Sequence, residues 1–188
     1  VSKVEEQGDQ VLVENAQGEQ LFFDRVIVAT PTNKLDEFLN PEQFAEDMAL
    51  LKQFKFEQGE LVMHTDTSVM PPNRKDWCVL SYMMDRKFTK QHFSVWLNSI
   101  EPSLVGKSPV FQTWNPVVDI DPKKVISKVT LTRAVVDTNT LNLNRELQQR
   151  HKDKNRKVFY CGSWSCDGLP ILESAVTSAM HIGEIFNA

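Results

Sequence analysis

The stretch that decides the fold is Lys157-Val-Phe-Tyr-Cys-Gly-Ser-Trp-Ser-Cys-Asp-Gly-Leu-Pro-Ile-Leu-Glu-Ser-Ala-Val-Thr-Ser-Ala-Met-His-Ile-Gly-Glu-Ile-Phe186. Residues 158–161 are apolar and stop at Gly162, which predicts a short buried strand. After a loop with Asp167-Gly168, a helix is predicted from about Leu172, because apolar residues then recur at helical spacing: Ala175, Ala179, Ile182 and Phe186. The end of the chain is therefore predicted to be strand, glycine, loop and helix.

This connection has a possible binding role. A glycine between a strand and a helix often holds an anion, because the first N–H groups of a helix have no partner inside it. The small side chains at positions 174, 175, 178 and 179 would also let a flat ligand or a neighbouring backbone come close. Any α/β domain contains similar connections with no ligand, so the geometry alone leaves both interpretations open.

The residues themselves are more specific than the geometry. Phe159-Tyr-Cys-Gly-Ser-Trp164, followed by Leu172-Glu-Ser-Ala-Val-Thr-Ser-Ala179, resembles the C-terminal flavin-binding segment of the flavin-containing amine oxidase and phytoene desaturase superfamily. This chain has Ser174 where the family has glycine, and Ser178-Ala179 where the family has Ser-Gly.

The resemblance implies which residues approach the cofactor, FAD. Gly162 and Ser163 would lie near its ribityl–phosphate part, and Trp164 would border the flavin pocket. The backbone N–H of Leu172 or Glu173 would point at the pyrimidine end of the isoalloxazine.

The start of the chain predicts a β-meander and a buried strand. Residues 10–15 and 20–23 are strand-like and are separated by a turn at Gly18, and Asp24-Arg-Val-Ile-Val-Ala-Thr-Pro31 predicts an apolar strand that enters a loop. A plain hairpin would explain the first part. The whole order resembles the segment by which the same superfamily re-enters its nucleotide-binding domain.

That resemblance implies a second set of cofactor contacts. The backbone of Val1, or alternatively of Val4, would hold the adenine. The turn of Ala29, Thr30 and Pro31 would lie beside the dinucleotide. The two sets of contacts come from opposite ends of the chain and in the order that the family shows.

The middle of the chain predicts a sheet with few helices. Two helices are predicted at about 33–39 and 41–52, a polar helix at about 138–151, and strands at 54–64, 77–84, 92–100, 109–114 and 125–136. Successive strands without helices between them imply an antiparallel or mixed sheet, so the fold class is α+β. The phrases His64-Thr-Asp66, Met70-Pro-Pro72 and Trp114-Asn-Pro116, with Trp77, resemble a bacterial subfamily of NAD/FAD-binding, amine-oxidase-like proteins.

The resemblance gives a domain division and shows what is missing. Residues 1–31 and 157–188 would be the remainder of an FAD-binding domain, and 32–156 a substrate-binding domain. A dinucleotide-binding fold needs Gly-x-Gly-x-x-Gly after its first strand. The seven glycines of this chain are too far apart for that motif: Gly8, Gly18, Gly59, Gly106, Gly162, Gly168 and Gly183.

Composition excludes several function classes. A formal charge of −4 over 188 residues argues against a general nucleic-acid or anionic-membrane binder. No apolar run approaches the roughly 18 residues of a membrane-spanning helix. Three cysteines, Cys78, Cys161 and Cys166, do not make a disulfide framework, so we expect a reducing, cytoplasmic location.

Other candidate sites are weaker. His64 and Asp66 lie on one face of a predicted strand end, where a surface or capping role is favoured over a general-base pair. The histidines have no metal-ligand spacing, and no metal site is predicted. The basic stretch 150–157 is interpreted as a solvated loop, with phosphate binding as the alternative.

Two hypotheses follow. The first is the C-terminal part of an FAD-dependent oxidoreductase, whose complete form would be an enzyme acting on a small-molecule or lipid-like substrate; the catalytic residues and any role of NAD are not predicted. These 188 residues alone would bind FAD weakly or not at all and would not turn over. The second is a non-catalytic α+β binding or scaffold domain. In either case, strand edges left open at 26–29 and 158–161 would favour self-association.

Overall fold

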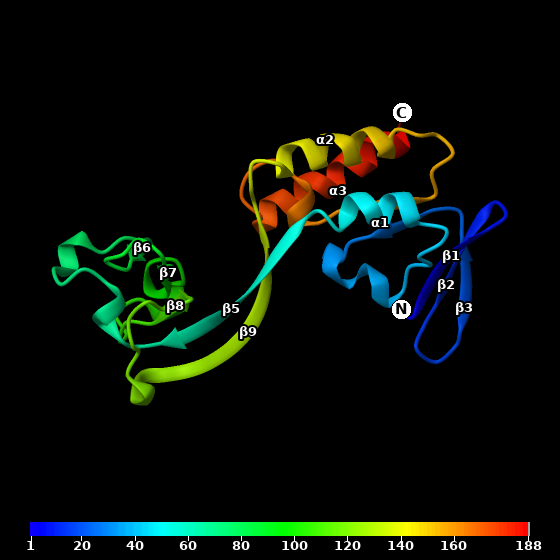
Figure 1. The fold of residues 1–188 in the computed structure, drawn as a ribbon. Coiled ribbons are helices and arrows are strands. Elements are labelled where there is room, and N and C mark those ends of the chain that lie inside the picture. The colour runs from blue at the N-terminus through cyan, green and yellow to red at the C-terminus, as the bar shows by residue number, and fades with distance from the viewer. Residues whose placement is uncertain (188) are drawn as a thin grey trace. The chain divides into compact units, whose positions relative to one another are not determined.

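A computed structural model describes residues 1–187 as two compact units (Figure 1). Unit 1 comprises Val1–Glu57 and Arg133–Ala188, and unit 2 comprises Gln58–Thr132. Two long strands, β5 (Lys55–His64) and β9 (Val125–Val135), run across the boundaries between them. Helices combined with antiparallel sheets confirm the predicted α+β class.

Unit 1 begins with the predicted meander. β1 (Lys3–Gln7), β2 (Gln10–Glu14) and β3 (Gln20–Phe23) form an antiparallel sheet in that order. The outer edge of β1 is occupied, because Val4 N donates to Phe38 O at 2.7 Å and Val4 O accepts from Asn40 N at 3.3 Å. In contrast, every residue of β3 is exposed and no described strand pairs with its outer edge.

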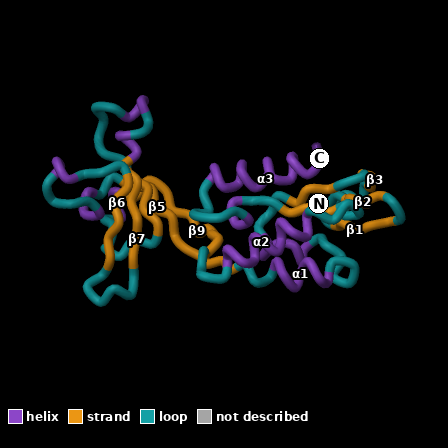
Figure 2. The backbone as a smooth tube through the Cα atoms, turned by 90° about the horizontal axis from the view of Figure 1, so that it is seen from above, coloured by secondary structure: helices purple, strands orange, loops and turns teal. Residues whose placement is uncertain are grey.

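The second sheet of unit 1 contains two short parallel strands, β4 (Val26–Val28) and β10 (Val158–Tyr160). Val158 and Tyr160 belong to a core that includes Leu143 and Leu147 of α2 (Thr140–His151) and Leu50 and Leu51 of α1 (Ala45–Leu51). Phe159 points the other way and packs with Ile182 of α3 (Leu172–Asn187). The helices α1 and α2 therefore cover one face of β10 and α3 covers the other; Figure 2 shows the three helices. Parallel strands need this cover on both faces.

The outer edge of β10 is closed by two side chains. Arg156 Nε donates to Val158 O at 2.6 Å, and Tyr160 N donates to His151 Nε2 at 3.2 Å. The prediction that the edge of the 158–161 strand lies open is therefore wrong. For β4 it stays a prediction, since among residues 1–187 no strand pairs with the edge of β4 that faces away from β10.

A mostly buried ion cluster joins the elements beneath β10. Asp47 of α1 is paired with Arg156 and, at 3.5 Å, with Arg150 of α2. Arg150 also donates to Glu46 O at 2.8 Å. The side chains of Asp47 and Arg156 are each 13% exposed, so the ions are compensated mainly by one another. The cluster connects α1 and α2 to Arg156, which lies two residues before β10.

Unit 2 is built on a five-stranded sheet in the order β6-β7-β8-β5-β9. Its further strands are β6 (Leu80–Met84), β7 (Gln91–Trp96) and β8 (Phe111–Trp114), and the β6–β7, β7–β8 and β8–β5 pairs are antiparallel. One face is buried and partly polar: His64, His92, Ser94, Phe111 and Thr113. Gly59 of β5 leaves room for the ring of Trp114, which an added Cβ would approach to 2.1 Å.

Several boundaries differ from the sequence predictions. The helix predicted at 33–39 is a 3-10 helix over Thr32–Glu37, and the next one is shorter than predicted, Ala45–Leu51. Unit 2 is smaller than the predicted substrate domain of 32–156. Residues 32–57 and 133–156 belong to unit 1 because α1 and α2 bury their leucines with β10.

Replacing Asp47 by Asn should destabilise unit 1 by about 3 kcal/mol, because two arginines would lose the carboxylate that compensates them. The measurement is chemical denaturation followed by the circular dichroism of the helices, since α1, α2 and α3 all lie in unit 1. Asp36→Asn is the matched control. Its pair with Lys52 joins two side chains that are more than half exposed, so its loss should cost less than about 1 kcal/mol. Equal losses for the two variants would contradict the role given to Asp47.

Acid should destabilise unit 1 through His151. Burial, and then the charge of Arg156, lowers the pKa of His151 to about 4. In the unfolded chain the pKa of histidine is about 6.5, so the unfolded state binds the extra proton first. Stability is therefore complete above about pH 6.5 and falls by about 3 kcal/mol as the pH approaches 4.

Denaturation of the helices at a series of pH values between 7 and 4 measures this effect. His151→Gln, which keeps an acceptor for Tyr160 N, should flatten the dependence. His181→Gln on the half-exposed side of α3 should leave the dependence unchanged. An unaltered pH profile in His151→Gln would rule out His151 as the source of the acid destabilisation.

Candidate cofactor site

The carboxyl ends of β4 and β10 meet in unit 1. Val28 lies opposite Tyr160 in the parallel register, and Cys161 N donates to Val28 O at 3.0 Å. The residues that follow each strand, Thr30 and Gly162, therefore belong to neighbouring loops. In open α/β sheets, ligands bind outside the carboxyl ends of the strands.

Trp164 joins these two loops directly. Its indole Nε1 donates to Thr30 O at 3.1 Å, and its ring packs edge-on against Phe54 with centroids 4.8 Å apart. The side chain is buried in the core of unit 1. The structure thus brings together Thr30 and Trp164, which lie far apart in the sequence, and places the indole beneath the loops.

Gly162 is required by the position of Trp164. Its φ of 152° is rarely adopted by other residues, and an added Cβ would lie 2.5 Å from Trp164 Nε1. Gly162 N donates to Ser178 Oγ at 3.0 Å, and Gly162 O accepts from Ser165 N at 3.1 Å. The sequence predicts for Ser178 only a small side chain that lets a neighbour come close. Its hydroxyl holds α3 against the end of β10.

The inward face of α3 differs from the predicted apolar stripe. The buried residues are Ser174, Ser178 and Ile182, whereas Ala179 is exposed and Ala175 is only half-buried. Each serine satisfies its hydroxyl locally, Ser174 on Leu169 O at 2.6 Å and Ser178 on Ala175 O at 2.8 Å. Serines that bond to their own helix or its entry loop can be buried at low cost.

The first turn of α3 presents free backbone donors. Ala175 N donates to Ile171 O at 3.2 Å, and no described residue accepts from Leu172 N or Glu173 N. Leu172 and Glu173 are both exposed. These two predicted site residues can therefore offer N–H groups to a ligand at the positive end of a sixteen-residue helix.

Two hydroxyls at the carboxyl end of β4 are buried without a partner among the described residues. They are Thr30 Oγ1 and Thr32 Oγ1. Asn144 Oδ1, on α2, is in the same condition, while its Nδ2 lies 3.4 Å from Asp167 Oδ1 in the loop before α3. Buried polar atoms ordinarily have a partner, so these atoms are suited to a polar ligand. Thr32 and Asn144 were missed in the sequence, where neither carries a motif.

The remaining predicted contacts are dispersed. Ala29 and Pro31 are exposed beside Thr30, and Ser163 is half-buried beside Gly162. Val1 is exposed, and no described contact connects it with Thr30 or Gly162. The alternative adenine contact, Val4, has both its backbone N–H and C=O engaged by the segment 38–40.

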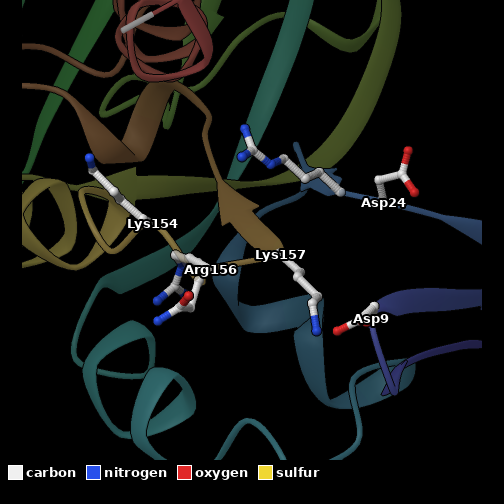
Figure 3. A pocket seen from close by; sticks show the side chains of 7 residues that line it. Asp9, Asp24, Lys154, Arg156 and Lys157 are labelled. Atoms are coloured by element: carbon white, nitrogen blue, oxygen red, sulfur yellow. The ribbon is translucent and has the colours of Figure 1, made fainter.

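The basic stretch lines a different hollow. A cavity of about 390 Å³ lies at the amino ends of β4 and β10, bordered by Arg25, Lys154, Asn155, Arg156 and Lys157 together with Asp9 and Asp24 (Figure 3). Lys157 Nζ donates to Gly8 O at 2.7 Å, and Arg156 is paired with Asp47. Two of its cations are therefore used inside the fold. The predicted solvated loop is wrong for Arg150 and His151, which belong to α2, and for Arg156, which is mostly buried.

His64 and Asp66 have structural roles in unit 2. Asp66 caps the turn at Thr67–Val69 by accepting from Ser68 N at 3.1 Å, and it also accepts from Asp121 N at 2.9 Å and Lys124 Nζ at 3.2 Å. These donors hold the pKa of Asp66 at about 2 against the opposing effect of burial. His64 Nδ1 accepts from Asp66 N at 3.1 Å. The capping interpretation is confirmed for Asp66, whereas the prediction of a surface position is wrong because both residues are buried.

Within residues 1–187, no group of three or more acidic, histidine or cysteine side chains is placed to hold a metal ion. No described helix has the length and apolar character needed to cross a membrane.

Comparisons with known proteins found a likeness only among solved structures. Neither a protein-family model nor a curated protein matches the chain. Among solved structures, the crystal structure of RAB GDI from Plasmodium falciparum is similar with a TM-score of 0.41 and 12% sequence identity. The match covers 98% of this chain and 40% of that one, so the chain spans less than half the length of this structure.

Gly162→Ala should destabilise unit 1 by about 2 kcal/mol or more, because the new methyl group meets the Trp164 indole in a backbone conformation disfavoured for alanine. Gly183→Ala is the control. It lies in α3 with nothing within 4 Å of its added Cβ, so it should be neutral or stabilising by up to about 1 kcal/mol. Denaturation followed by the helical circular dichroism compares the two. A Gly162→Ala protein as stable as Gly183→Ala would contradict this account of the loop.

Proposed function

We propose that the chain is the C-terminal part of an FAD-dependent oxidoreductase of the amine oxidase and phytoene desaturase kind. The observation that supports this best is the meeting of Thr30 and Gly162 at the carboxyl ends of two parallel strands, where Gly162 N also donates to Ser178 of α3. The sequence resemblance gives flavin contacts to these two loops and to the first turn of the same helix. A single ligand-binding edge of the sheet then accounts for both observations.

The polar groups at this edge suit parts of FAD. Unpaired N–H groups at Leu172 and Glu173 would donate to the carbonyl oxygens of a flavin pyrimidine ring. The orphaned hydroxyls of Thr30 and Thr32 would bond to the ribityl or phosphate oxygens. Gly162 and Ser163 would let the ligand approach the backbone. The residues present therefore fit one side of the cofactor.

The pyrophosphate-binding loop would come from another segment. None of the seven glycines in these residues forms Gly-x-Gly-x-x-Gly, yet β4 offers an unpaired edge. A further parallel strand added there would bring its own carboxyl end beside Thr30, where the loop of a dinucleotide-binding fold lies. We therefore expect that the 188 residues alone hold FAD weakly or not at all and do not turn over.

Unit 2 offers a surface for an apolar substrate. On the open face of its sheet, alternate residues of two strands are apolar and at least partly exposed: Leu61 and Met63 of β5, and Phe93 and Val95 of β7. None of these side chains is charged. A small, apolar or lipid-like molecule fits this face better than an ionic one, because an ion would lose hydration without gaining a partner.

The reaction follows from the cofactor. Bound flavin would accept a hydride equivalent from a substrate C–H, while the protein orients the two molecules and excludes water. The alternative function, a binding or scaffold domain without a cofactor, differs in having no use for the groups at Thr30 and Leu172.

The whole protein that contains this chain should be yellow when purified, with the visible absorption bands of a flavin that denaturation releases as FAD. The 188-residue chain mixed with FAD and desalted should be colourless. A colourless whole protein that takes up no added FAD would overturn the proposal and leave the non-catalytic domain.

Thr30→Val sharpens the test. Its hydroxyl has no partner among residues 1–187, so the variant should be at least as stable as the parent. If that hydroxyl binds the cofactor, the dissociation constant of the whole protein for FAD should rise by roughly tenfold in the variant. Ser68→Ala in unit 2 serves as the control and should leave FAD affinity unchanged. Unchanged affinity in Thr30→Val would remove Thr30 from the site.

A further inference from the structure

The hairpin between β6 and β7 carries an exposed aromatic residue among cations. Phe88 lies at its tip and is 76% exposed. Its backbone has a φ of 56°, in the left-handed region where a bulky side chain is uncommon and Gly or Asn is usual. The turn gains nothing from a phenyl ring that touches so little of the protein, so the ring is suited to an external partner.

The charges around Phe88 are positive and available. Arg86, Lys87 and Lys90 are exposed, and none of them forms an ion pair with a described residue. The one acidic residue of the tip, Asp85, uses its carboxylate within the turn, where it accepts from Thr89 N at 2.7 Å and Lys90 N at 2.9 Å. The tip therefore presents three cations around one apolar ring.

The apolar character continues along β6. Leu80, Tyr82 and Met84 lie on one face of the strand, and each is more than 40% exposed. Tyr82, the most exposed of the three at 67%, has an aromatic ring with a polar end, which favours the boundary between apolar and aqueous surroundings.

We propose that this hairpin, residues 80–91, docks on the surface of an anionic phospholipid bilayer. Phe88 would enter the boundary between headgroups and acyl chains, while Arg86, Lys87 and Lys90 contact lipid phosphates. An apolar tip with basic flanks is the pattern of segments that lie in a membrane interface. Because the whole chain has a charge of −4, the attraction is local to the hairpin and depends on anionic lipid. The proposal is independent of any cofactor.

The test is sedimentation of the whole protein with extruded vesicles of phosphatidylcholine, with and without phosphatidylglycerol, at low and at physiological salt. Binding should occur only with phosphatidylglycerol and should weaken as salt screens the charges. Phe88→Ser should lower the partition coefficient by roughly tenfold or more, the effect of losing one buried phenyl group. Replacing Arg86, Lys87 and Lys90 by Gln should lower it by roughly fivefold for each charge.

Two control variants separate the hairpin from general surface effects. Val105→Ser removes an apolar side chain that is 71% exposed in a loop next to Gly106-Lys107, outside the hairpin. A triple change of Lys107, Lys123 and Lys152 to Gln removes an equal charge elsewhere. Both should keep most of the vesicle binding.

A direct readout of insertion comes from Phe88→Trp. Its fluorescence should be quenched by brominated phosphatidylglycerol vesicles more strongly than that of the parent protein. Absence of binding to anionic vesicles, or equal binding by Phe88→Ser and Val105→Ser, would overturn the proposal. If the hairpin binds a protein and not a bilayer, the whole protein should not bind anionic vesicles.

Discussion

The buried indole of Trp164 is the constraint on which unit 1 depends. A tryptophan N–H inside a core needs an acceptor, and here it is Thr30 O at 3.1 Å. That bond fixes the loop after β10 against the loop after β4. It also leaves space for no side chain at position 162, which explains the glycine without reference to a ligand. Two strands of three residues each have few ladder bonds of their own, so this contact supplies much of their alignment.

The edge of β10 shows how the fold ends a sheet. Arg156 and His151 supply a donor and an acceptor where a further strand would otherwise pair. The cost is a buried guanidinium, which Asp47 compensates, and a buried imidazole that remains neutral. At β4 no such device is present among residues 1–187. A further strand could therefore pair with the outer edge of β4 but not with the outer edge of β10.

Local pattern was enough to predict much of this fold. The alternation of 10–23 predicted the meander, and the spacing after Pro170 predicted the start of α3 at Leu172, where the structure has it. The predicted buried face of α3 was wrong because the apolar spacing takes no account of serines. Ser174 and Ser178 can be buried because their hydroxyls donate to nearby carbonyls. The closed edge of β10 was also beyond prediction, since it depends on His151 and Arg156 approaching the strand from the outside. The candidate site was also predicted only in part. Thr30 and Gly162 lie in sequence motifs, but the buried, unpartnered oxygens of Thr32 and Asn144 can be found only from the tertiary structure.

The buried face of the sheet in unit 2 contains polar side chains among its apolar ones. On the buried face, His64 and His92 each accept a backbone N–H at Nδ1, from Asp66 and Val117, so each ring is neutral with its proton on Nε2. His64 can then donate to Thr113 Oγ1 at 2.8 Å, and Thr113 to Ser94 Oγ at 2.7 Å. Burial lowers the pKa of both histidines, in keeping with this neutral state. Both histidines thus hold loops in place through these bonds. The open face of the sheet and the hairpin at its edge carry apolar or cationic side chains that are at least partly exposed.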